Sequence, residues 1–506
     1  MNKLDNFFKI SERGSNVKTE IIAGLTTFFA MAYIVVTNPN QVTGFVTGGA
    51  FGTIWNAVYI ASILVAVVGT LLYALYAKLP FAQACGMGLN SFFFVAFIVP
   101  SMLNPMEGYR EGLAVILLSG IVFLILSVTG ARVYIAKALP DCLKKAIPAG
   151  IGLFIAFIGF KNVGIIQTNM YTFVQLFDFH GIIDAIGMNL GELAAGNALG
   201  TVSDAVYGAY QAHFNYDMTS VVTELEAWRV IAPVVLSLLG LFAIAVLEKK
   251  NVKGSVIITI LGATVLYYLT TWQLPTFDLG QIGQSFKDFG EFGLFGAFKG
   301  FETLFVGGAT AIVNVIVLTV TFTLVDMFDT IGTLYGTASQ ADMLDENGDP
   351  IDVEKSMASD SIATVSGALL GTSTCTTFVE SASGVAAGGR TGLASLVTAA
   401  CFALCLFLAP VAAIVPACAT APALIYVGVL MLKNFAKVDM SDIAQAVPAF
   451  LALIMMPLTY SISNGIAVGA IAYTLITLFT GKYTKKDIVV TIIAILFTLR
   501  FFLVTM

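Results

Sequence analysis

The chain carries a long series of apolar segments, and this feature constrains its fold more than any other. A helix needs about 20 predominantly apolar residues to cross the hydrocarbon core of a bilayer. Hydrophobic residues make up 58% of the 506 residues and charged residues only 11%, which excludes an ordinary soluble domain. We therefore predict an all-α polytopic membrane protein. Its fifteen candidate spans are residues 20–37, 56–77, 81–101, 112–130, 146–166, 229–248, 253–271, 304–326, 358–370, 374–389, 392–410, 411–433, 444–462, 464–481 and 486–505.

The span count is open near the C-terminus, but the orientation is not. Residues 444–481 form either one broken span or two, and the last segment either spans the membrane or lies in the interface. Lys and Arg mark the cytoplasmic side of membrane proteins. They gather on one side, in residues 1–19, 132–145, 249–253 and 482–486. We expect a multi-pass protein of the plasma membrane (the bacterial inner membrane) with residues 1–19 in the cytoplasm.

Two polar insertions and the cysteines point to no bound metal. We expect residues 167–228, with His180 and His213, to form a long external loop, and residues 338–357 to form an acidic cytoplasmic loop. The run D-E-N-G-D lacks the ligand spacing of a calcium loop, so a solvated turn is expected. The cysteines form no CxxC pair and are interpreted as small buried residues. We expect no cofactor, no metal and no nucleic-acid partner, because the net charge of −6 is spread through loops.

A weak internal repeat relates two short segments. Q-A-C-G-M-G-L-N (83–90) and T-S-T-C-T-T-F-V-E (372–380) each place a polar residue five positions after a cysteine, with Cys85 and Cys375 offset by 290. About seven spans separate them, and an odd number makes the repeats inverted in the membrane. Broken spans in corresponding halves are typical of a transporter's binding site. We predict short strands in both, each followed by a helix that begins near Gly88 or Glu380.

Two carboxylates, Asp326 and Asp329, end the apolar run 304–326, and Glu380 follows the second predicted strand. A buried Asp costs about 2.5–3.5 kcal/mol at a helix centre on insertion scales. The alternative is that these acids cap or solvate the cytoplasmic end of the span. We favour a functional role because no basic residue lies inside the central spans to neutralise them. Their expected partners are protons, backbone donors, or a ligand with N–H groups, such as the edge of a purine or pyrimidine.

Four motifs resemble one known family: N-V-K-T-E-I-I-A-G-L-T-T-F-F-A-M-A-Y-I (16–34), A-C-G-M-G-L-N-S-F-F (84–93), L-V-D-M-F-D-T-I-G-T-L (324–334) and A-L-L-G-T-S-T-C-T-T-F-V-E-S-A-S-G-V-A-A-G-G-R-T-G-L (368–393). The chain resembles AzgA-like adenine, guanine and hypoxanthine permeases of the nucleobase–cation symporter superfamily, which includes the xanthine and uracil permeases. The resemblance covers residues 7–482. Cys375 and Phe378 depart from the pattern, where valine and tyrosine are expected, and the 167–228 insertion is longer than expected.

The resemblance implies fourteen transmembrane segments in two inverted repeats of seven, divided into core and gate domains. The repeats would be residues 20–271 and 304–506, joined by a linker loop at 272–303. Substrate would lie between the third, eighth and tenth spans. The implied substrate-binding residues are Asn90, Asp326, Glu380, Gly88, Phe328 and Thr376. The proton-coupling candidates are Asp329, Asp326 and Glu380.

The sequence therefore predicts a proton-coupled importer of purine nucleobases, not an enzyme. Alternatives of the same fold are a xanthine/uracil-type permease and a Na⁺-coupled carrier. An anion carrier is disfavoured because an anion site would not be lined by acids without a base. An intramembrane aspartyl hydrolase is a remote alternative, since it needs two Asp residues facing each other from different helices. Expected partners are a purine base, protons and the lipid bilayer, with a homodimer left open.

Overall fold

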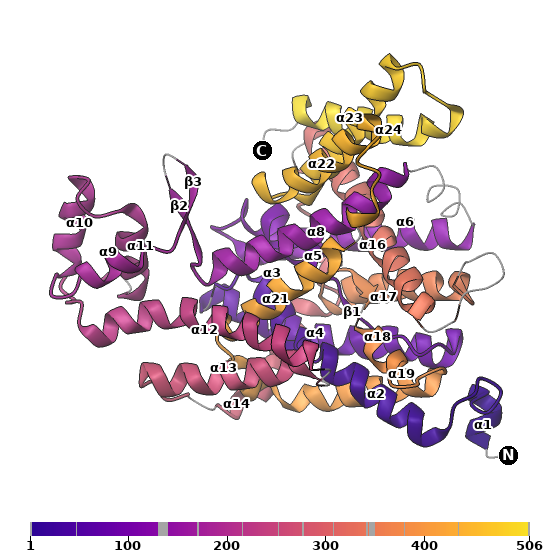
Figure 1. The fold of residues 1–506 in the computed structure, drawn as a ribbon, viewed down its shortest axis with the longest axis horizontal. Coiled ribbons are helices and arrows are strands. Elements are labelled where there is room, and N and C mark those ends of the chain that lie inside the picture. Colours follow the sequence, from indigo (N-terminus) through magenta and orange to yellow (C-terminus); the bar gives the residue numbers. More distant parts are fainter. Residues whose placement is uncertain are drawn as a thin grey trace. The chain divides into compact units, whose positions relative to one another are not determined.

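The computed structural model places most of the chain in helices (Figure 1). It describes residues 3–46, 48–129, 140–169, 172–214, 216–250, 252, 254–275, 278–306, 308–340, 343, 350–378, 380–433 and 435–503. The chain divides into two compact units, each described by itself. Unit 1 comprises residues 1–155, 278–413 and 427–506, and unit 2 comprises residues 156–277 and 414–426.

Unit 1 contains the chain termini and most of the helices. Its helices are α1 (Lys3–Phe8), α2 (Val17–Met31), α3 (Ile34–Val42), α4 (Gly49–Leu72), α5 (Met87–Phe93), α6 (Pro105–Val128), α14 (Gly280–Asp288), α15 (Gly296–Gly300), α16 (Ala309–Gln340), α17 (Val353–Leu370), α18 (Ser381–Ala386), α19 (Gly392–Leu404), α20 (Ala409–Ala413), α22 (Ile443–Leu458), α23 (Ile462–Phe479) and α24 (Ile488–Leu503). Short π-helical turns at Tyr73–Ala77, Phe94–Ile98 and Phe289–Gly293 continue α4, α5 and α14. Single 3₁₀ turns lie at Cys405–Phe407, Phe435–Lys437 and Lys485–Asp487.

Unit 2 combines long helices with a small polar subdomain. It contains the hairpin β2 (Ile166–Asn169) and β3 (Phe173–Leu176), with α9 (Phe179–Asp184), α10 (Leu190–Ala198), α11 (Asp204–His213), α12 (Glu224–Lys249) and α13 (Ser255–Thr271). Two helices, α8 (Asp141–Asn162) and α21 (Ala417–Leu432), contribute residues to both units.

The helices have the length and composition that a membrane requires. Eight of the described helices are long and apolar enough to cross a bilayer, and five shorter apolar helices accompany them. The open question at 444–481 has a clear answer, because α22 and α23 are separate helices that meet at Thr459–Ser461. Gly465 and Gly469 of α23 approach Met456 and Ala452 of α22, so the two helices form an antiparallel hairpin.

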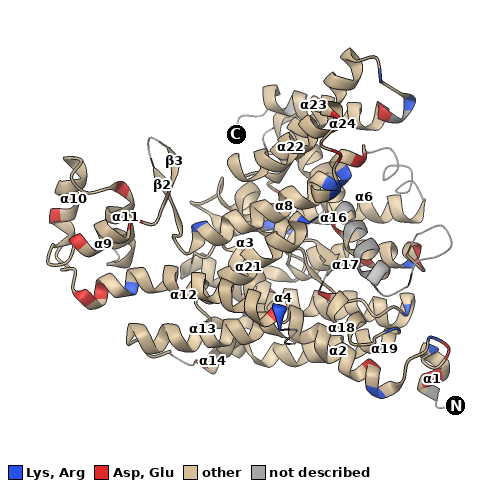
Figure 2. Cartoon of the chain, viewed as in Figure 1, with Lys and Arg blue, Asp and Glu red and all other residues tan. Residues whose placement is uncertain are grey.

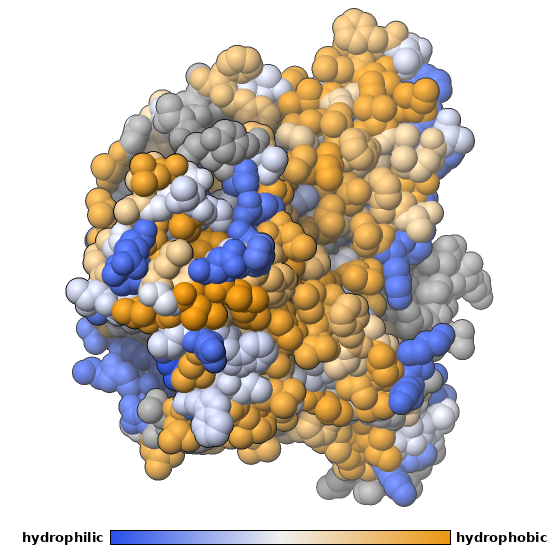
Figure 3. Space-filling view, turned by 60° about the vertical axis from the view of Figure 1, so that its left-hand side comes forward, coloured by the Kyte–Doolittle hydropathy of each residue, from blue (hydrophilic) through white to orange (hydrophobic). Residues whose placement is uncertain are grey.

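The surface also fits a lipid environment. Leu261, Val265 and Leu269 are exposed on α13 at intervals of four residues, which places them on one face. Figure 3 shows a face of the molecule on which apolar side chains cover most of the area. In Figure 2, charged residues gather in α1 and around α9 to α11, whereas long stretches of the other helices carry none. The six cysteines are unpaired thiols, and all but Cys401 are buried, as predicted.

The two predicted strands are present and pair with each other. β1 (Gln83–Cys85) and β4 (Cys375–Thr377) form a two-stranded antiparallel sheet, and all six residues are buried. The register is Gln83 with Thr377, Ala84 with Thr376 and Cys85 with Cys375. The last pair joins the two residues that the sequence offset of 290 relates. Antiparallel pairing at that point is the local symmetry that an inverted repeat would produce.

Two segments expected to be loops are largely folded. The segment 167–228 contains the β2–β3 hairpin and three helices packed around buried Ile182, Leu190, Leu193 and Tyr210. Local signals explain these helices: Asn189 and Glu192 form a capping box at α10, and Ser203 caps α11. The linker 272–303 contains α14 and α15. Within the cytoplasmic loop expected at 338–357, residues 341–342 and 344–349, including the D-E-N-G-D run, lie outside the described residues.

Candidate functional site

Four carboxyl groups of unit 1 form an acid cluster beside the β1–β4 sheet. We define this acid cluster as Asp326 and Asp329 of α16, Asp360 of α17, and Glu380, which directly precedes α18. Electrostatic interactions join Asp326 to Asp329 and Asp360, and join Asp329 to Glu380. The helices that carry these residues lie near β1 in Figure 1. Both carboxylates predicted from the i, i+3 spacing on α16 therefore belong to one cluster.

Asp326 is fully buried, and only one of its two carboxylate oxygens has a hydrogen-bond partner. The Thr364 hydroxyl of α17 donates a hydrogen bond of 2.7 Å to Asp326 Oδ2. The other oxygen, Asp326 Oδ1, is buried and has no hydrogen-bond partner. Thr364 also accepts a bond of 3.1 Å from the Cys375 backbone N–H, which fixes the threonine against β4. One carboxylate oxygen of Asp326 is thus left for a further donor.

Asp360 is the carboxyl group that sequence reasoning missed. It is fully buried, and both of its oxygens accept hydrogen bonds. Gln83 Nε2 of β1 donates to Asp360 Oδ1 at 2.8 Å, and the Thr330 hydroxyl of α16 donates to Oδ2 at 2.6 Å. Asp360 therefore ties α17 to both β1 and α16. Its signal was available, because it lies two positions inside the predicted span 358–370, but no role was assigned to it from the sequence.

Glu380 has a tyrosine partner from the first predicted span. That span is interrupted at Ala32 and Tyr33, between α2 and α3. The Tyr33 hydroxyl donates to Glu380 Oε1 at 2.6 Å, and the Tyr33 side chain is buried. The two residues are 347 positions apart in sequence. No local pattern could predict this contact, which brings a further segment of the chain, between α2 and α3, to the acid cluster.

Asn90 lies in a separate group of polar contacts on α5. The Ser373 hydroxyl donates to Asn90 Oδ1, and Asn90 Nδ2 donates to Gln41 Oε1 of α3 at 3.4 Å. Gln41 Nε2 and the neighbouring Thr374 hydroxyl are buried without partners. Among the described residues, Asn90 makes no hydrogen bond to the acid cluster. It approaches the same β4 segment from the other broken span.

The remaining predicted site residues have different surroundings. The Thr376 hydroxyl is a hydrogen-bonding neighbour of Asp329, which places Thr376 beside the acid cluster. Gly88 packs closely against α8, since a Cβ at this position would lie 2.4 Å from Ile151 Cγ2. A larger residue at Gly88 would separate α5 from α8. The backbone of Phe328 belongs to α16, but its side chain lies outside the described residues.

Three of the four carboxyl groups of the acid cluster make no ion pair with a described residue. Among the described residues, no ion pair includes Asp326, Asp360 or Asp329. Buried neighbouring carboxyl groups disfavour simultaneous ionisation. At least one member of the acid cluster is therefore expected to hold a proton. Carboxyl groups in such a setting can accept N–H donors from a ligand and can exchange protons.

Known proteins are similar to this chain over most of its length. The profile of the Permease family (Xan_ur_permease) matches residues 18–198 and 180–468. The guanine/hypoxanthine permease PbuO of Bacillus subtilis is 36% identical over 498 residues, covering 98% of this chain and 100% of PbuO. The adenine permease AdeP of Escherichia coli is 33% identical over 497 residues, covering 98% of this chain and 95% of AdeP.

A solved structure supports the fold. The transmembrane domain of the bicarbonate transporter BicA from a cyanobacterium superposes with a TM-score of 0.53 at 16% identity. The match covers 89% of this chain and 97% of that domain. At this level of identity the likeness concerns the polytopic helical fold alone.

Proposed function

Because the chain belongs to the Xan_ur_permease family, we propose that it is a proton-coupled importer of the purine nucleobases adenine, guanine and hypoxanthine. Its relatives are named as permeases, so the chain is a membrane transporter of the nucleobase permease family and not an enzyme. The hydrolase alternative is thereby excluded. The adenine and guanine/hypoxanthine permeases among its relatives support a purine substrate.

One observation carries this proposal: among the described residues, the buried carboxyl groups of Asp326 and Asp360 next to the paired strands make no ion pair with a basic residue. A purine edge presents N–H groups, and a carboxylate accepts them through its two oxygens. Asp326 Oδ1 is buried without a partner and is the acceptor that we assign to the base. We assign Glu380 as the second acceptor, held by Tyr33. Asn90 and Thr376 would orient the base, since their side chains both donate and accept hydrogen bonds.

We assign the coupling proton to Asp329. Asp329 interacts with both Asp326 and Glu380, so its charge affects the two acceptors assigned to the base. A proton on Asp329 removes a negative charge beside them and favours binding of a neutral base. Release of that proton to the cytoplasm then weakens binding on the inner side. Asp326 is the alternative carrier.

The proposed architecture follows the family resemblance. Fourteen spans in two inverted repeats would place the base where β1 and β4 pair, with the N-terminus in the cytoplasm. The antiparallel register at Cys85 and Cys375 supports the inverted relation of the two halves. Transport would then move a core domain relative to a gate domain around this point. An anion carrier of the same fold is disfavoured because Asp326, Asp329 and Asp360 make no ion pair with a basic residue among the described residues.

Uptake of labelled bases by the Glu380→Gln variant tests the proposal. We expect wild-type protein to take up labelled hypoxanthine and adenine, with competition by guanine. Glu380→Gln should lower purine uptake about 100-fold, since loss of one partner of a buried charged hydrogen bond costs about 2–5 kcal/mol. Glu354→Gln, at the exposed start of α17, is the matched acid-to-amide control. Wild-type uptake of every purine by Glu380→Gln would refute the site.

A further inference from the structure

Tyr73 is a buried residue beside the acid cluster that the proposed function does not use. It begins the π-helical turn that continues α4, and its side chain is fully buried. The Tyr73 hydroxyl lies 2.6 Å from the Thr377 hydroxyl of β4, with either atom as the donor. The Tyr73 ring packs edge-on against Phe81, and the ring centroids are 5.8 Å apart. Contacts with two further segments therefore fix the Tyr73 hydroxyl next to the β1–β4 sheet.

The Tyr73 hydroxyl also interacts with two residues on one face of α17. Asp360 of the acid cluster interacts electrostatically with Tyr73, and the Ser356 hydroxyl is a hydrogen-bonding neighbour of Tyr73. Ser356 and Asp360 are four residues apart, so they lie one turn apart on the same face of the helix. Both residues are fully buried. Tyr73 therefore connects the acid cluster to the preceding turn of α17.

The turn of α17 that carries Ser356 leads to the surface. The Ser356 hydroxyl donates to the Asp352 carbonyl at 3.2 Å. Lys355 and Asp352 form an ion pair of 2.7 Å, and their side chains are 46% and 28% exposed. We place this end of α17 in the cytoplasm, together with residues 338–357. Tyr73 thus joins a carboxyl group sealed from water to a hydroxyl group beside the aqueous end of α17.

The side chains that donate to Asp360 do not continue toward the surface. Gln83 donates through an amide N–H, and an amide N–H is a donor that does not accept a proton in return. The Thr330 hydroxyl donates to Asp360 and accepts from the Thr377 backbone N–H at 3.4 Å, so this contact also ends at an N–H group. A hydroxyl both donates and accepts, so it can pass a proton on. The Tyr73 hydroxyl has a hydroxyl neighbour on the surface side.

The groups that face Asp360 favour a proton on this cluster. Asp360 interacts electrostatically with Asp326 and Asp329 of α16, with Tyr73, and with the Cys375 thiol of β4. Among the described residues, no ion pair includes Asp360. Neighbouring buried carboxyl groups disfavour simultaneous ionisation and titrate as a coupled set. A proton held by the set can therefore reside on Asp360, beside Tyr73.

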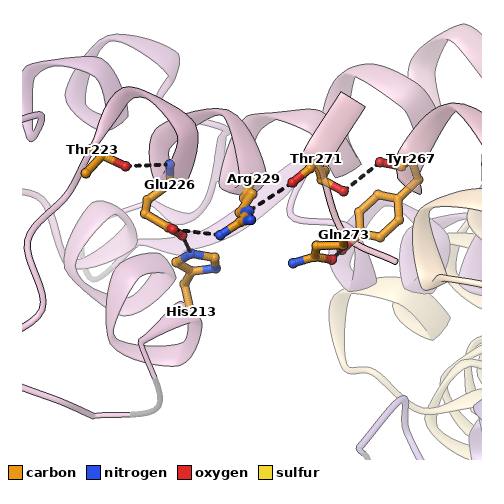
Figure 4. A network of polar contacts seen from close by, with 7 residues as sticks. All are labelled: His213, Thr223, Glu226, Arg229, Tyr267, Thr271 and Gln273. Carbon is orange, nitrogen blue, oxygen red and sulfur yellow. Dashed lines mark hydrogen bonds and ion pairs between the residues drawn. The ribbon is translucent and has the colours of Figure 1, made fainter. Parts of the chain in front are cut away.

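The polar network of unit 2 also contains a carboxylate and a tyrosine, but it is arranged differently (Figure 4). His213 contacts Glu226, and Arg229 Nη1 donates to Glu226 Oε1 at 2.7 Å. Tyr267 donates to the amide oxygen of Gln273 at 3.2 Å. In this network a cation compensates the carboxylate, and the tyrosine ends at an amide. Tyr73, by contrast, has a carboxyl group that makes no described ion pair on one side and a serine hydroxyl on the other.

We propose that Tyr73 relays the coupling proton from Asp360 to Ser356, and so from the acid cluster to the cytoplasm. The proposal rests on the proposed function, because it takes the coupling proton from it; Asp360 receives that proton from Asp329, its electrostatic neighbour. Asp360 gives the proton to the Tyr73 oxygen, the Tyr73 hydroxyl proton passes to the Ser356 oxygen, and the Ser356 hydroxyl proton passes to water. Each hydroxyl gains one proton and loses one, so Asp360 ends as a carboxylate and the water as hydronium.

Transport by the Tyr73→Phe variant in proteoliposomes tests the proposal, because phenylalanine keeps the ring and lacks the hydroxyl. A pH-sensitive dye inside the vesicles reports proton entry, and labelled hypoxanthine reports accumulation and exchange. A positioned proton-transfer group contributes about 10²–10⁴-fold to a rate, so we expect proton entry and accumulation to slow about tenfold or more, while hypoxanthine exchange stays within about twofold of wild type. Ser356→Ala should show the same difference between accumulation and exchange.

Tyr59→Phe is the matched control. Tyr59 is also fully buried in α4, and its hydroxyl donates to the Cys405 carbonyl at 2.6 Å, so this variant loses a hydroxyl that contacts a backbone group. It should keep proton entry, accumulation and exchange.

The outcomes separate this proposal from the proposed function. Proton entry and accumulation by Tyr73→Phe equal to those of Tyr59→Phe would overturn the relay and leave the proposed function intact. Equal losses of exchange and accumulation would also overturn the relay, because a purely structural role slows both. If Tyr73→Phe does not insert into the membrane, the same criteria apply to Ser356→Ala. Accumulation by wild-type protein that ignores the pH gradient would contradict the proposed function itself.

Discussion

The acid cluster of unit 1 and the polar network of unit 2 both hold carboxylates away from water, but their partners differ. In unit 2, Glu226 is compensated by Arg229 and contacts His213. In unit 1, the donors to Asp326 and Asp360 among the described residues are hydroxyl and amide groups. A compensated carboxylate stabilises the positions of helices. A carboxylate without a cation in a membrane protein is expensive to maintain and indicates binding of protons or ligand.

The largest effect that this comparison predicts is that of Asp360→Asn. The new amide group would bring an N–H donor against the Gln83 amide or the Thr330 hydroxyl, and it would remove a charge beside Asp326. We expect purine uptake to fall about 30- to 100-fold, in line with about 2–3 kcal/mol for a lost charged hydrogen bond. Surface expression should match that of Glu354→Gln. Unchanged uptake would show that Asp360 has a structural role, as Glu226 of unit 2 does.

A smaller effect on uptake is expected at Glu226. Glu226→Gln removes the charge that compensates Arg229, and both side chains are only about one-fifth exposed (20% and 22%). We expect the melting temperature of the purified protein to fall by about 2–4 °C, which corresponds to about 1 kcal/mol. Uptake at saturating hypoxanthine should stay within about threefold of wild type. A loss of uptake as large as that of Asp360→Asn, at unchanged stability, would contradict the division between the two regions.

The smallest effect is expected at Asp217, in the exposed part of the 167–228 subdomain. Hydrogen bonds from the Thr219 hydroxyl and backbone N–H and from Ser220 hold the pKa of this carboxyl below its ordinary value of 3.8. Because the folded pKa is lowered, these bonds stabilise the protein above pH 3.8 and lose their effect as pH falls through the folded pKa. Asp217→Asn should therefore change the melting temperature at pH 7 only slightly, and the difference should vanish as the pH falls through the lowered pKa of Asp217. A large shift in uptake would be unexplained.

Sequence patterns predicted those parts of the site that depend on local chemistry. Pro80 and the surrounding glycines predicted an interruption in the third span, and the spacing of Asp326 and Asp329 predicted one helical face. The structure contains β1, β4 and both carboxylates accordingly. The repeat offset of 290 also related Cys85 to Cys375, and these two residues pair in the sheet.

Contacts between distant elements could not be predicted in this way. The Tyr33–Glu380 bond and the Gln83–Asp360 bond join residues hundreds of positions apart, and no periodicity encodes such pairs. The folded segment 167–228 was missed because its helices are short and polar, so their caps are a stronger signal than their hydrophobic pattern. Mean apolarity predicts membrane spans but gives no information on this polar subdomain.

Accumulation of labelled hypoxanthine in proteoliposomes under an imposed pH gradient tests the central claim most directly. With the full-length protein and no sodium, an acidic exterior should concentrate hypoxanthine inside, and a protonophore should abolish that accumulation. Asp329→Asn mimics the protonated carrier, so it should exchange hypoxanthine across the membrane without concentrating it. Accumulation that requires Na⁺ and ignores the pH gradient would contradict the account, because the acid cluster would then bind a metal cation instead of the coupling proton.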